Sequence, residues 1–241
     1  MVLADSLFVG GWAFSAEALR REEFARDVIS IHDLGWESGS DGLVANAADR
    51  LQKHISNGKP RILLAWSTGA MIALETASRC PQNICGLVIL AGTPSFISRE
   101  GFKHGTEPAQ LRALRMQLKR DRQSALRSFY RTVLRPGSGH ESLMEFWMSA
   151  SVGIPEQSLA AGLHYLETFD ARAAATEIRV PTLILHGAND EVVPCAAGAE
   201  LAGLIPRAKF VEFKGLGHYL FADRRKEVLE AIEEFSTGCR L

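Results

Sequence analysis

Residues 62–70, I-L-L-A-W-S-T-G-A, decide the fold of this chain. A short apolar run leads into Ser67, Gly69 follows two positions later, and A-M-I-A-L-E then continues with a pattern typical of a helix. This arrangement is either an ordinary strand-to-helix turn or a nucleophile elbow, in which a serine lies on a strained turn between small residues. Ala65 occupies the first small position, where the G-x-S-x-G pattern has glycine. The rest of the chain decides between the two interpretations.

Short apolar runs rich in β-branched residues alternate with helical patterns on both sides of this stretch. Continuous apolar strands separated by helices are typical of a parallel sheet that is covered on both faces. We therefore predict an α/β fold with a mostly parallel, doubly wound sheet. The expected strands are residues 6–9, 28–32, 61–66, 86–91, 182–186 and 209–213. The expected helices are residues 15–26, 40–57, 68–79, 195–204 and 224–236.

The alternation stops between residues 95 and 170, where the sequence indicates successive helices without a strand. Ligands of open α/β sheets bind at the carboxyl ends of the strands, so a helical insertion after the fourth strand is expected to cover that edge. We predict a core made of residues 1–94 and 171–241, with residues 95–170 as a helical cap. The cap would then form the roof of an active site.

Composition limits the class of protein and of partner. The chain has 241 residues, of which 46% are hydrophobic and 23% are charged, as in soluble globular proteins. Its formal net charge of −1 argues against a nucleic-acid binder. No apolar stretch approaches the roughly 20 residues that span a bilayer, and the N-terminus lacks the basic leader of a signal peptide. The cysteines have no metal-binding spacing, and we expect them to be reduced thiols. We further expect a cytoplasmic monomer that needs neither a metal nor an organic cofactor.

A serine hydroxyl becomes a good nucleophile only when a histidine takes its proton and an acid orients that histidine. With a serine at an elbow, the acid and then the histidine are expected later in the chain. Asp190 lies in the loop after the fifth expected strand, and His218 lies in a glycine-rich loop after the sixth. Each residue alone is compatible with a turn or a surface loop, and Glu191 is an alternative acid. Their order and positions predict a catalytic triad of Ser67, Asp190 and His218.

A tetrahedral intermediate also needs hydrogen-bond donors for its oxyanion. The residue after the nucleophile supplies one backbone N–H, which assigns Thr68. The second donor is expected in the loop after the first strand, V-G-G-W-A-F-S, where Trp12 follows two glycines. A glycine turn followed by a core tryptophan would also explain that loop, but it would leave the oxyanion with a single donor. We therefore assign the N–H groups of Trp12 and Thr68 to the oxyanion hole.

Together these residues resemble the α/β-hydrolase superfamily over nearly the whole chain. Within it, the sequence is similar to the pimeloyl-[acyl-carrier protein] methyl ester esterases of biotin synthesis. The matching stretches are G-G-W, W-S-T-G, A-G-T-P-S-F, L-E-T-F-D-A-R and V-P-T-L-I-L-H-G-A-N-D-E-V-V-P, with G-G-W in place of the commoner H-G-W. The resemblance implies a serine carboxylesterase that cleaves a carrier-bound methyl ester through an acyl-enzyme. A general short-chain esterase or thioesterase and, from another class, a non-catalytic ligand-binding protein are the alternatives.

Residues 110–136 of the expected cap hold eight basic side chains and one acid, Asp121. Such a charge pattern can steer an acidic partner, and the resemblance implies that acidic acyl carrier protein docks on the cap; the alternative is a solvated helix face. The candidates for carrier docking are Arg112, Arg115, Lys119, Arg120, Arg122, Arg127, Arg131 and Arg135. Phe129 and Trp147 are candidates for substrate contact, although such residues more often pack in the core. Trp66, beside the nucleophile, is the best single candidate for the pocket.

Overall fold

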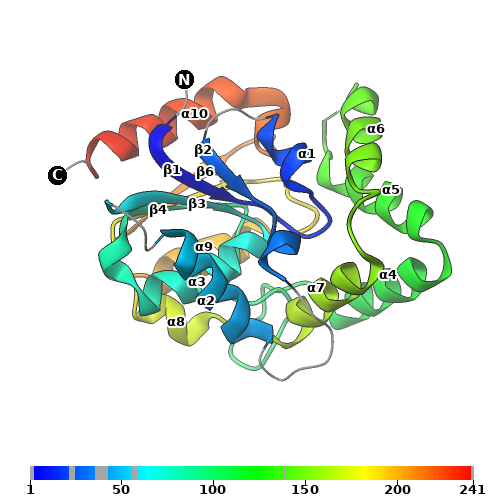
Figure 1. The fold of residues 1–241 in the computed structure, drawn as a ribbon, viewed down its shortest axis with the longest axis horizontal. Helices are drawn as coiled ribbons and strands as arrows, with labels where there is room; N and C mark the ends of the chain where they lie inside the picture. The colour runs from blue at the N-terminus through cyan, green and yellow to red at the C-terminus, as the bar shows by residue number, and fades with distance from the viewer. Residues whose placement is uncertain (1–2, 22–24, 36–42, 56–58, 138, 240–241) are drawn as a thin grey trace.

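A six-stranded parallel sheet forms the centre of the molecule (Figure 1). The computed structural model describes residues 3–21, 25–35, 43–55, 59–137 and 139–239. The strands are Leu3–Val9 (β1), Ala25–Ile29 (β2), Arg61–Trp66 (β3), Ile84–Leu90 (β4), Thr182–Gly187 (β5) and Ala208–Phe213 (β6). All neighbouring strands are parallel, in the order β2-β1-β3-β4-β5-β6. The predicted α/β fold is confirmed.

The order of the strands reverses between β1 and β3. β2 pairs with one side of β1 and β3 pairs with the other, where Val9 lies beside Ala65. The connections that follow β1 and β3 run to opposite faces of the sheet. They leave a crevice at the carboxyl ends of these two strands, which is the usual ligand site of an open α/β sheet. Gly10 and Ser67 are the first residues after these two strands, so the loops that they begin meet at this crevice.

Helices cover both faces of the sheet (Figure 1). In this view α1 (Ala16–Arg20) and α10 (Phe221–Thr237) lie above the sheet, and the other layer lies below it. The lower layer consists of Leu43–Ile55 (α2), Thr68–Arg79 (α3), Arg172–Thr176 (α8) and Cys195–Leu204 (α9). Because both faces are covered, every residue of the inner strand β5 is buried, whereas none of the edge strand β2 is. Among the described residues, no helix has the length and apolar character needed to cross a membrane.

Four further helices lie between β4 and β5 in the chain and occupy the right of Figure 1. They are Pro108–Arg120 (α4), Arg122–Val133 (α5), Glu141–Ala150 (α6) and Glu156–Thr168 (α7). The described residues between β4 and β5 add no strand to the sheet, and this confirms the predicted helical insertion after the fourth strand. An isolated bridge joins Ser95 and Asp170, close to where the chain leaves and re-enters the sheet. The division into core and cap at these residues stays a prediction.

The expected strand at residues 28–32 is displaced toward the N-terminus. Strand β2 is Ala25–Ile29, and Ile31–Leu34 form a short 3-10 helix, η1. Ser30 ends the strand because its hydroxyl and the Asp33 carboxylate form a capping box that starts η1. Local side-chain hydrogen bonds therefore replace the strand pairing that was expected for the last residues of this segment.

The expected helix at residues 15–26 is shorter in the structure. α1 ends at Arg20, residues 22–24 lie outside the described part of the chain, and β2 follows. Pairing with β1 outweighs the helix propensity of this charged segment, because propensity is a weak preference that tertiary contacts override. The outer ends of the helix expected at residues 40–57 also lie outside the described residues, and the other expected elements are observed within about three residues of their predicted ends.

Candidate active site

Ser67 lies at a sharp turn between β3 and α3. Its backbone has φ 57° and ψ −122°, a conformation that residues with a side chain rarely adopt. The end of β1 passes very close to this turn: a Cβ atom on Gly69 would lie 2.5 Å from the Gly10 carbonyl oxygen and 2.6 Å from that of Val9. Glycine therefore lets the start of α3 pack against the end of β1, and the serine side chain projects from the turn.

The Ser67 hydroxyl forms a hydrogen-bonded chain with His218 and Asp190. Ser67 Oγ lies 2.9 Å from His218 Nε2, and His218 Nδ1 lies 2.8 Å from Asp190 Oδ2. The three side chains follow β3, β6 and β5 respectively. Because the carboxylate accepts the proton on Nδ1, the lone pair on Nε2 faces the serine hydroxyl. The arrangement can transfer a proton from the serine to the histidine.

The Asp190 carboxylate is completely buried and accepts hydrogen bonds on both oxygens. The backbone N–H groups of Val192 and Val193 donate to Oδ1, each at 2.8 Å. His218 Nδ1 and His186 Nε2 lie 2.8 and 3.2 Å from Oδ2. Burial opposes ionisation of Asp190, but the adjacent His218 and the bonds from both histidines more than offset it and hold the pKa well below its usual value. Asp190 is therefore ionised at neutral pH and can orient His218.

His186 lies beside the hydrogen-bonded chain of Ser67, His218 and Asp190, and its place in the sequence did not assign it to the site. Its Nδ1 has no hydrogen-bond partner among the described residues and faces Gly198, where a Cβ atom would lie 2.2 Å away. The four-residue spacing from His186 to Asp190 at one strand end was the available signal. Glu191, the alternative acid, has another partner, because its carboxylate pairs with Arg135 at 2.9 Å.

Two backbone N–H groups adjoin Ser67. The N–H of Trp12 donates to Thr68 Oγ1 at 3.3 Å, which holds the loop after β1 against the start of α3. Thr68 is the first residue of α3, so its own N–H has no acceptor within the helix. The N-terminus of a helix also stabilises negative charge. The assignment of these two groups to an oxyanion hole stays a prediction that the geometry allows.

A cavity of about 330 Å³ opens beside Ser67 and runs between α4 and α5. Its lining is mostly apolar. The residues of α4 and α5 that line it are Gln110, Leu111, Ala113, Leu114, Gln117, Ser128, Phe129 and Thr132. An acyl chain attached to an ester at Ser67 can therefore extend between these helices. In the part of the chain that the structure describes, no cluster of three or more His, Cys, Asp or Glu side chains could hold a metal ion.

Comparison with known proteins agrees with this geometry. The profile of the "Alpha/beta hydrolase family" matches residues 7–231. The chain belongs to the α/β-hydrolase family. A pimeloyl-[acyl-carrier protein] methyl ester esterase of Nitrosomonas europaea is 30% identical over 226 residues, covering 90% of this chain and 89% of that protein. Its counterpart in Chromobacterium violaceum is 28% identical over 239 residues, covering 95% and 93%.

Solved structures share the fold of this hydrolase. An esterase from Exiguobacterium antarcticum superposes with a TM-score of 0.82 at 20% identity, covering 98% of this chain and 93% of that one. A bromoperoxidase from Bacillus anthracis gives a TM-score of 0.81 with the same identity and coverage. The family and its esterase relatives make the chain a hydrolase that acts on esters.

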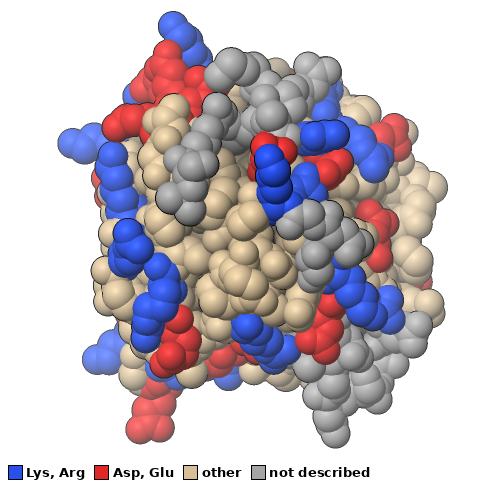
Figure 2. All heavy atoms as spheres, turned by 60° about the vertical axis from the view of Figure 1, so that its left-hand side comes forward, with Lys and Arg blue, Asp and Glu red and all other residues tan. Residues whose placement is uncertain are grey.

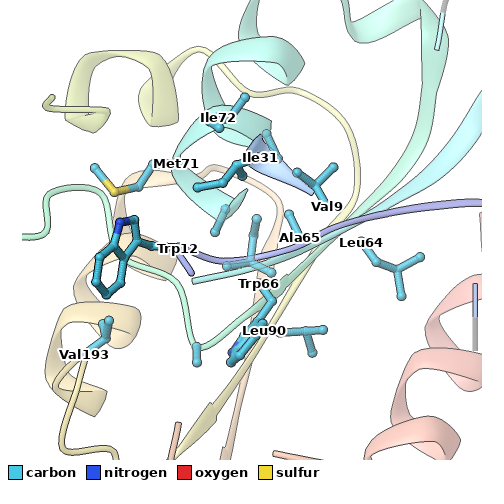
Figure 3. Close-up of a cluster of buried hydrophobic side chains, with 14 of the residues drawn as sticks. Val9, Trp12, Ile31, Leu64, Ala65, Trp66, Met71, Ile72, Leu90 and Val193 are labelled. Carbon is cyan, nitrogen blue, oxygen red and sulfur yellow. The ribbon is translucent and has the colours of Figure 1, made fainter. Parts of the chain in front are cut away.

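The structure separates the three residues expected to contact substrate. Phe129 lines the cavity of the hydrolase, and its ring centre lies 4.9 Å from that of Trp12. Trp66 and Trp147 do not line it; both are 1% exposed and pack against Phe14. Figure 3 shows Trp66 within the buried cluster at the end of β3. The indole N–H of Trp66 donates to the carbonyl oxygen of His218 at 3.1 Å, so Trp66 packs against His218 outside the cavity lining, and its contact with substrate stays a prediction.

The eight basic residues of α4, α5 and the turn that follows α5 fall into two groups. Three form ion pairs, namely Arg115 with Glu167, Arg127 with Glu145 and Arg135 with Glu191, and Arg122 donates to the Ser151 carbonyl at 2.6 Å. The other four are exposed and have no ion pair with a described residue; they are Arg112, Lys119, Arg120 and Arg131. Figure 2 brings forward the left side of Figure 1, away from α4–α7, and there basic and acidic side chains are interspersed.

Proposed function

We propose that this hydrolase is a serine carboxylesterase that removes the methyl ester of pimeloyl-acyl carrier protein. The observation that carries the proposal is the hydrogen-bonded chain from Ser67 through His218 to Asp190, beside an apolar cavity. The choice of ester rests on the name of the relatives that span most of the chain. Acyl carrier protein would be the partner that delivers the substrate.

The first half of the reaction forms an acyl-enzyme. Ser67 Oγ attacks the carbonyl carbon of the methyl ester while His218 Nε2 takes the serine proton. The N–H groups of Trp12 and Thr68 stabilise the oxyanion of the tetrahedral intermediate. His218 then donates its proton to the methoxy oxygen, the carbon–oxygen bond breaks, and methanol leaves.

The second half regenerates the enzyme. A water molecule loses a proton to His218 and attacks the acyl carbon, the same N–H groups stabilise the second oxyanion, and the protonated His218 returns its proton to the Ser67 oxygen as it leaves. The product is a free carboxylate at the end of the acyl chain. Asp190 remains ionised throughout and stabilises the positive charge that His218 carries in both halves.

The helices of residues 95–170 would act as a cap that shapes the pocket and receives the carrier. We propose that the free basic residues of α4 and α5 bind the acidic carrier protein. Arg112, Met116 and Lys119 follow one another at helical spacing on α4, and Met116 is 73% exposed. An apolar side chain between unpaired cations suits a partner that offers both carboxylates and a small apolar contact.

The test of the substrate compares pimeloyl-carrier methyl ester with p-nitrophenyl butyrate. We expect the wild type to demethylate the carrier-bound ester, as detected by mass spectrometry of the carrier, and Ser67→Ala to be inactive on both substrates. If the wild type cleaves only the small ester, the general short-chain esterase is the correct alternative. If a fluorophosphonate fails to label Ser67, the protein is not a serine esterase.

The docking surface is tested by charge reversal. The double variant of Arg112→Glu and Lys119→Glu should lower kcat/KM for the carrier-bound ester about tenfold, because it converts attraction into repulsion. The effect should shrink at high salt, and kcat/KM for p-nitrophenyl butyrate should not change. The matched control is Lys209→Glu with Lys226→Glu, outside the cap. Equal losses in both double variants would show that docking does not depend on α4.

A further inference from the structure

The loop that carries the Trp12 amide has an unfavourable backbone conformation. Ala13, the next residue, has φ 68°, in the left-handed region that residues with a Cβ rarely adopt. Such a conformation persists only where the surrounding structure holds it in place. Ala13 is completely buried, so the groups that hold it belong to the protein itself.

Side chains from two other segments bind the two peptide groups of Ala13. Its N–H donates to His32 Nε2 at 3.1 Å, and its carbonyl oxygen accepts a bond from the Tyr130 hydroxyl at 2.5 Å. Tyr130 belongs to α5, one of the inserted helices. Burial raises the pKa of the Tyr130 hydroxyl, so that it keeps its proton and remains a donor.

His32 can accept this bond only as a neutral ring with its proton on Nδ1. Nδ1 lies 2.7 Å from Ser158 Oγ at the start of α7, and the serine oxygen is a suitable acceptor for that proton. Burial and then the nearby Arg122 guanidinium lower the pKa of His32 to about 3. The ring is therefore neutral at neutral pH, and its orientation is set by α7.

α7 also contacts Trp12 directly. The indole N–H of Trp12 donates to the Leu159 carbonyl oxygen at 2.9 Å. A Cβ atom on Gly162 would lie 2.5 Å from the indole ring, so the helix backbone packs closely against it. The inserted helices α5 and α7 therefore hold the Trp12 side chain and the Ala13 carbonyl directly, and α7 acts on the Ala13 N–H through His32 of η1.

We infer that Tyr130 and His32, the latter oriented by Ser158, are positioning residues that clamp Ala13 and thereby hold the Trp12 N–H beside Ser67, where its 3.3 Å bond to Thr68 Oγ1 would give way to a bond to the oxyanion. The inference rests on the proposed serine-esterase function, because the direction of this N–H matters most in the tetrahedral intermediate. A misdirected donor weakens binding of the transition state and leaves binding of the substrate largely unchanged. The inserted helices then support the chemical step as well as the substrate pocket.

The principal test is Tyr130→Phe, which removes only the hydroxyl. Loss of one oxyanion donor lowers kcat about 10²- to 10³-fold in comparable sites, so a donor that is merely misdirected should lower kcat for p-nitrophenyl butyrate about 10- to 100-fold, with little change in KM. The affinity for an alkyl trifluoromethyl ketone, which forms a tetrahedral adduct with the serine, should fall by the same factor. A purely structural role of the hydroxyl would not make these two losses equal.

The matched control is Tyr165→Phe, which makes the same change at a buried tyrosine of α7 outside the cavity lining. The control should retain the wild-type kcat and ketone affinity. If Tyr130→Phe and Tyr165→Phe have the same kcat, the inference is overturned.

A second pair of variants decides the matter if Tyr130→Phe does not fold, as judged by near-UV circular dichroism. His32→Gln keeps an oxygen that can accept from the Ala13 N–H, whereas His32→Leu removes the acceptor. The glutamine variant should retain most of the wild-type kcat, and the leucine variant should lose about 10- to 100-fold. Equal kcat values for the two variants would overturn the inference.

The small ester keeps this test separate from that of the proposed substrate. If the wild type cleaves p-nitrophenyl butyrate but not the carrier-bound ester, the substrate proposal fails, and the ratio of kcat between Tyr130→Phe and Tyr165→Phe still decides the role of Tyr130. If the wild type cleaves neither ester and a fluorophosphonate does not label Ser67, both proposals fail together.

Discussion

Replacing Gly69 by alanine tests whether the contact between the serine turn and the end of β1 sets the geometry of the site. The added Cβ would lie 2.5 Å from the Gly10 carbonyl oxygen and 2.6 Å from that of Val9. An ordinary carbon–oxygen contact is about 3.3–3.6 Å, so the two segments must separate by roughly 0.9 Å. Both oxygens belong to the backbone, and no side-chain rotation can relieve the overlap.

The substitution should affect both stability and rate. Overpacking of this kind lowers the free energy of unfolding by about 1–3 kcal/mol, and the gain in helix propensity returns at most about 1 kcal/mol. In a protein of this size 1 kcal/mol corresponds to about 2–4 °C in Tm. The loop that carries Trp12 would also move relative to Ser67, and misplacement on this scale should lower kcat about 100-fold.

The assay combines thermal unfolding with hydrolysis of p-nitrophenyl butyrate. The matched control is Gly203→Ala in the last turn of α9, where an added Cβ would meet no atom within 4 Å. The control gains the same helix propensity without overlap, so its Tm should stay equal or rise and its kcat should be unchanged. If Gly69→Ala keeps the kcat and Tm of the control, close packing at this turn does not set the geometry of the site.

Three further predictions concern the site. Asp190→Asn should lower kcat on the order of 10⁴-fold, because asparagine favours the wrong histidine tautomer. Since folding lowers the pKa of Asp190, its charge stabilises the fold fully above the unfolded pKa of about 3.9, and this contribution is lost as pH falls toward the folded pKa. In urea titrations below about pH 4, the free energy of unfolding should therefore fall less steeply with pH for the asparagine variant than for the wild type. His186→Leu removes the Nε2–H group, which lies 2.9 Å from the Val193 carbonyl oxygen and 3.2 Å from Asp190 Oδ2, and should lower the free energy of unfolding by about 1–3 kcal/mol and reduce kcat. Unchanged kinetics would exclude a supporting role. Phe129→Ala should raise KM for acyl esters, because Phe129 lines the cavity. Trp66→Phe should lower Tm and kcat without raising KM, because its indole donates to the His218 carbonyl at 3.1 Å behind the cavity. A raised KM for Trp66→Phe in steady-state kinetics would restore Trp66 to the pocket.

The fold class was predictable because its signals are local. A strand buried on both faces is a short run of apolar residues, and a helix that covers it has an apolar stripe, so both leave a periodic pattern in the sequence. The absence of a strand pattern between residues 95 and 170 likewise predicted the helical insertion. One error lay where a tertiary contact overrode a local preference: at residues 15–26 pairing with β1 outweighed helix propensity.

The members of the candidate site were predictable for a related reason. Parallel strands end at one edge of the sheet, so residues just after β3, β5 and β6 can meet although they are far apart in the chain. The order of Ser67, Asp190 and His218 therefore indicated them as partners, and the structure brings them within 2.9 Å of one another along the chain of hydrogen bonds. Their catalytic roles are the proposal that the kinetic tests address.

By itself the sequence determined the α/β architecture, the place of the helical insertion and the serine turn, because periodicity, glycine spacing and chain order are properties of neighbouring residues. Only the tertiary structure decided that Trp66 packs behind the cavity, that His186 contacts Asp190, and that Tyr130 and His32 bind the two sides of Ala13. These contacts depend on the direction of individual side chains from segments that are distant in the chain. Such directions are set by packing, which no local pattern of residues records.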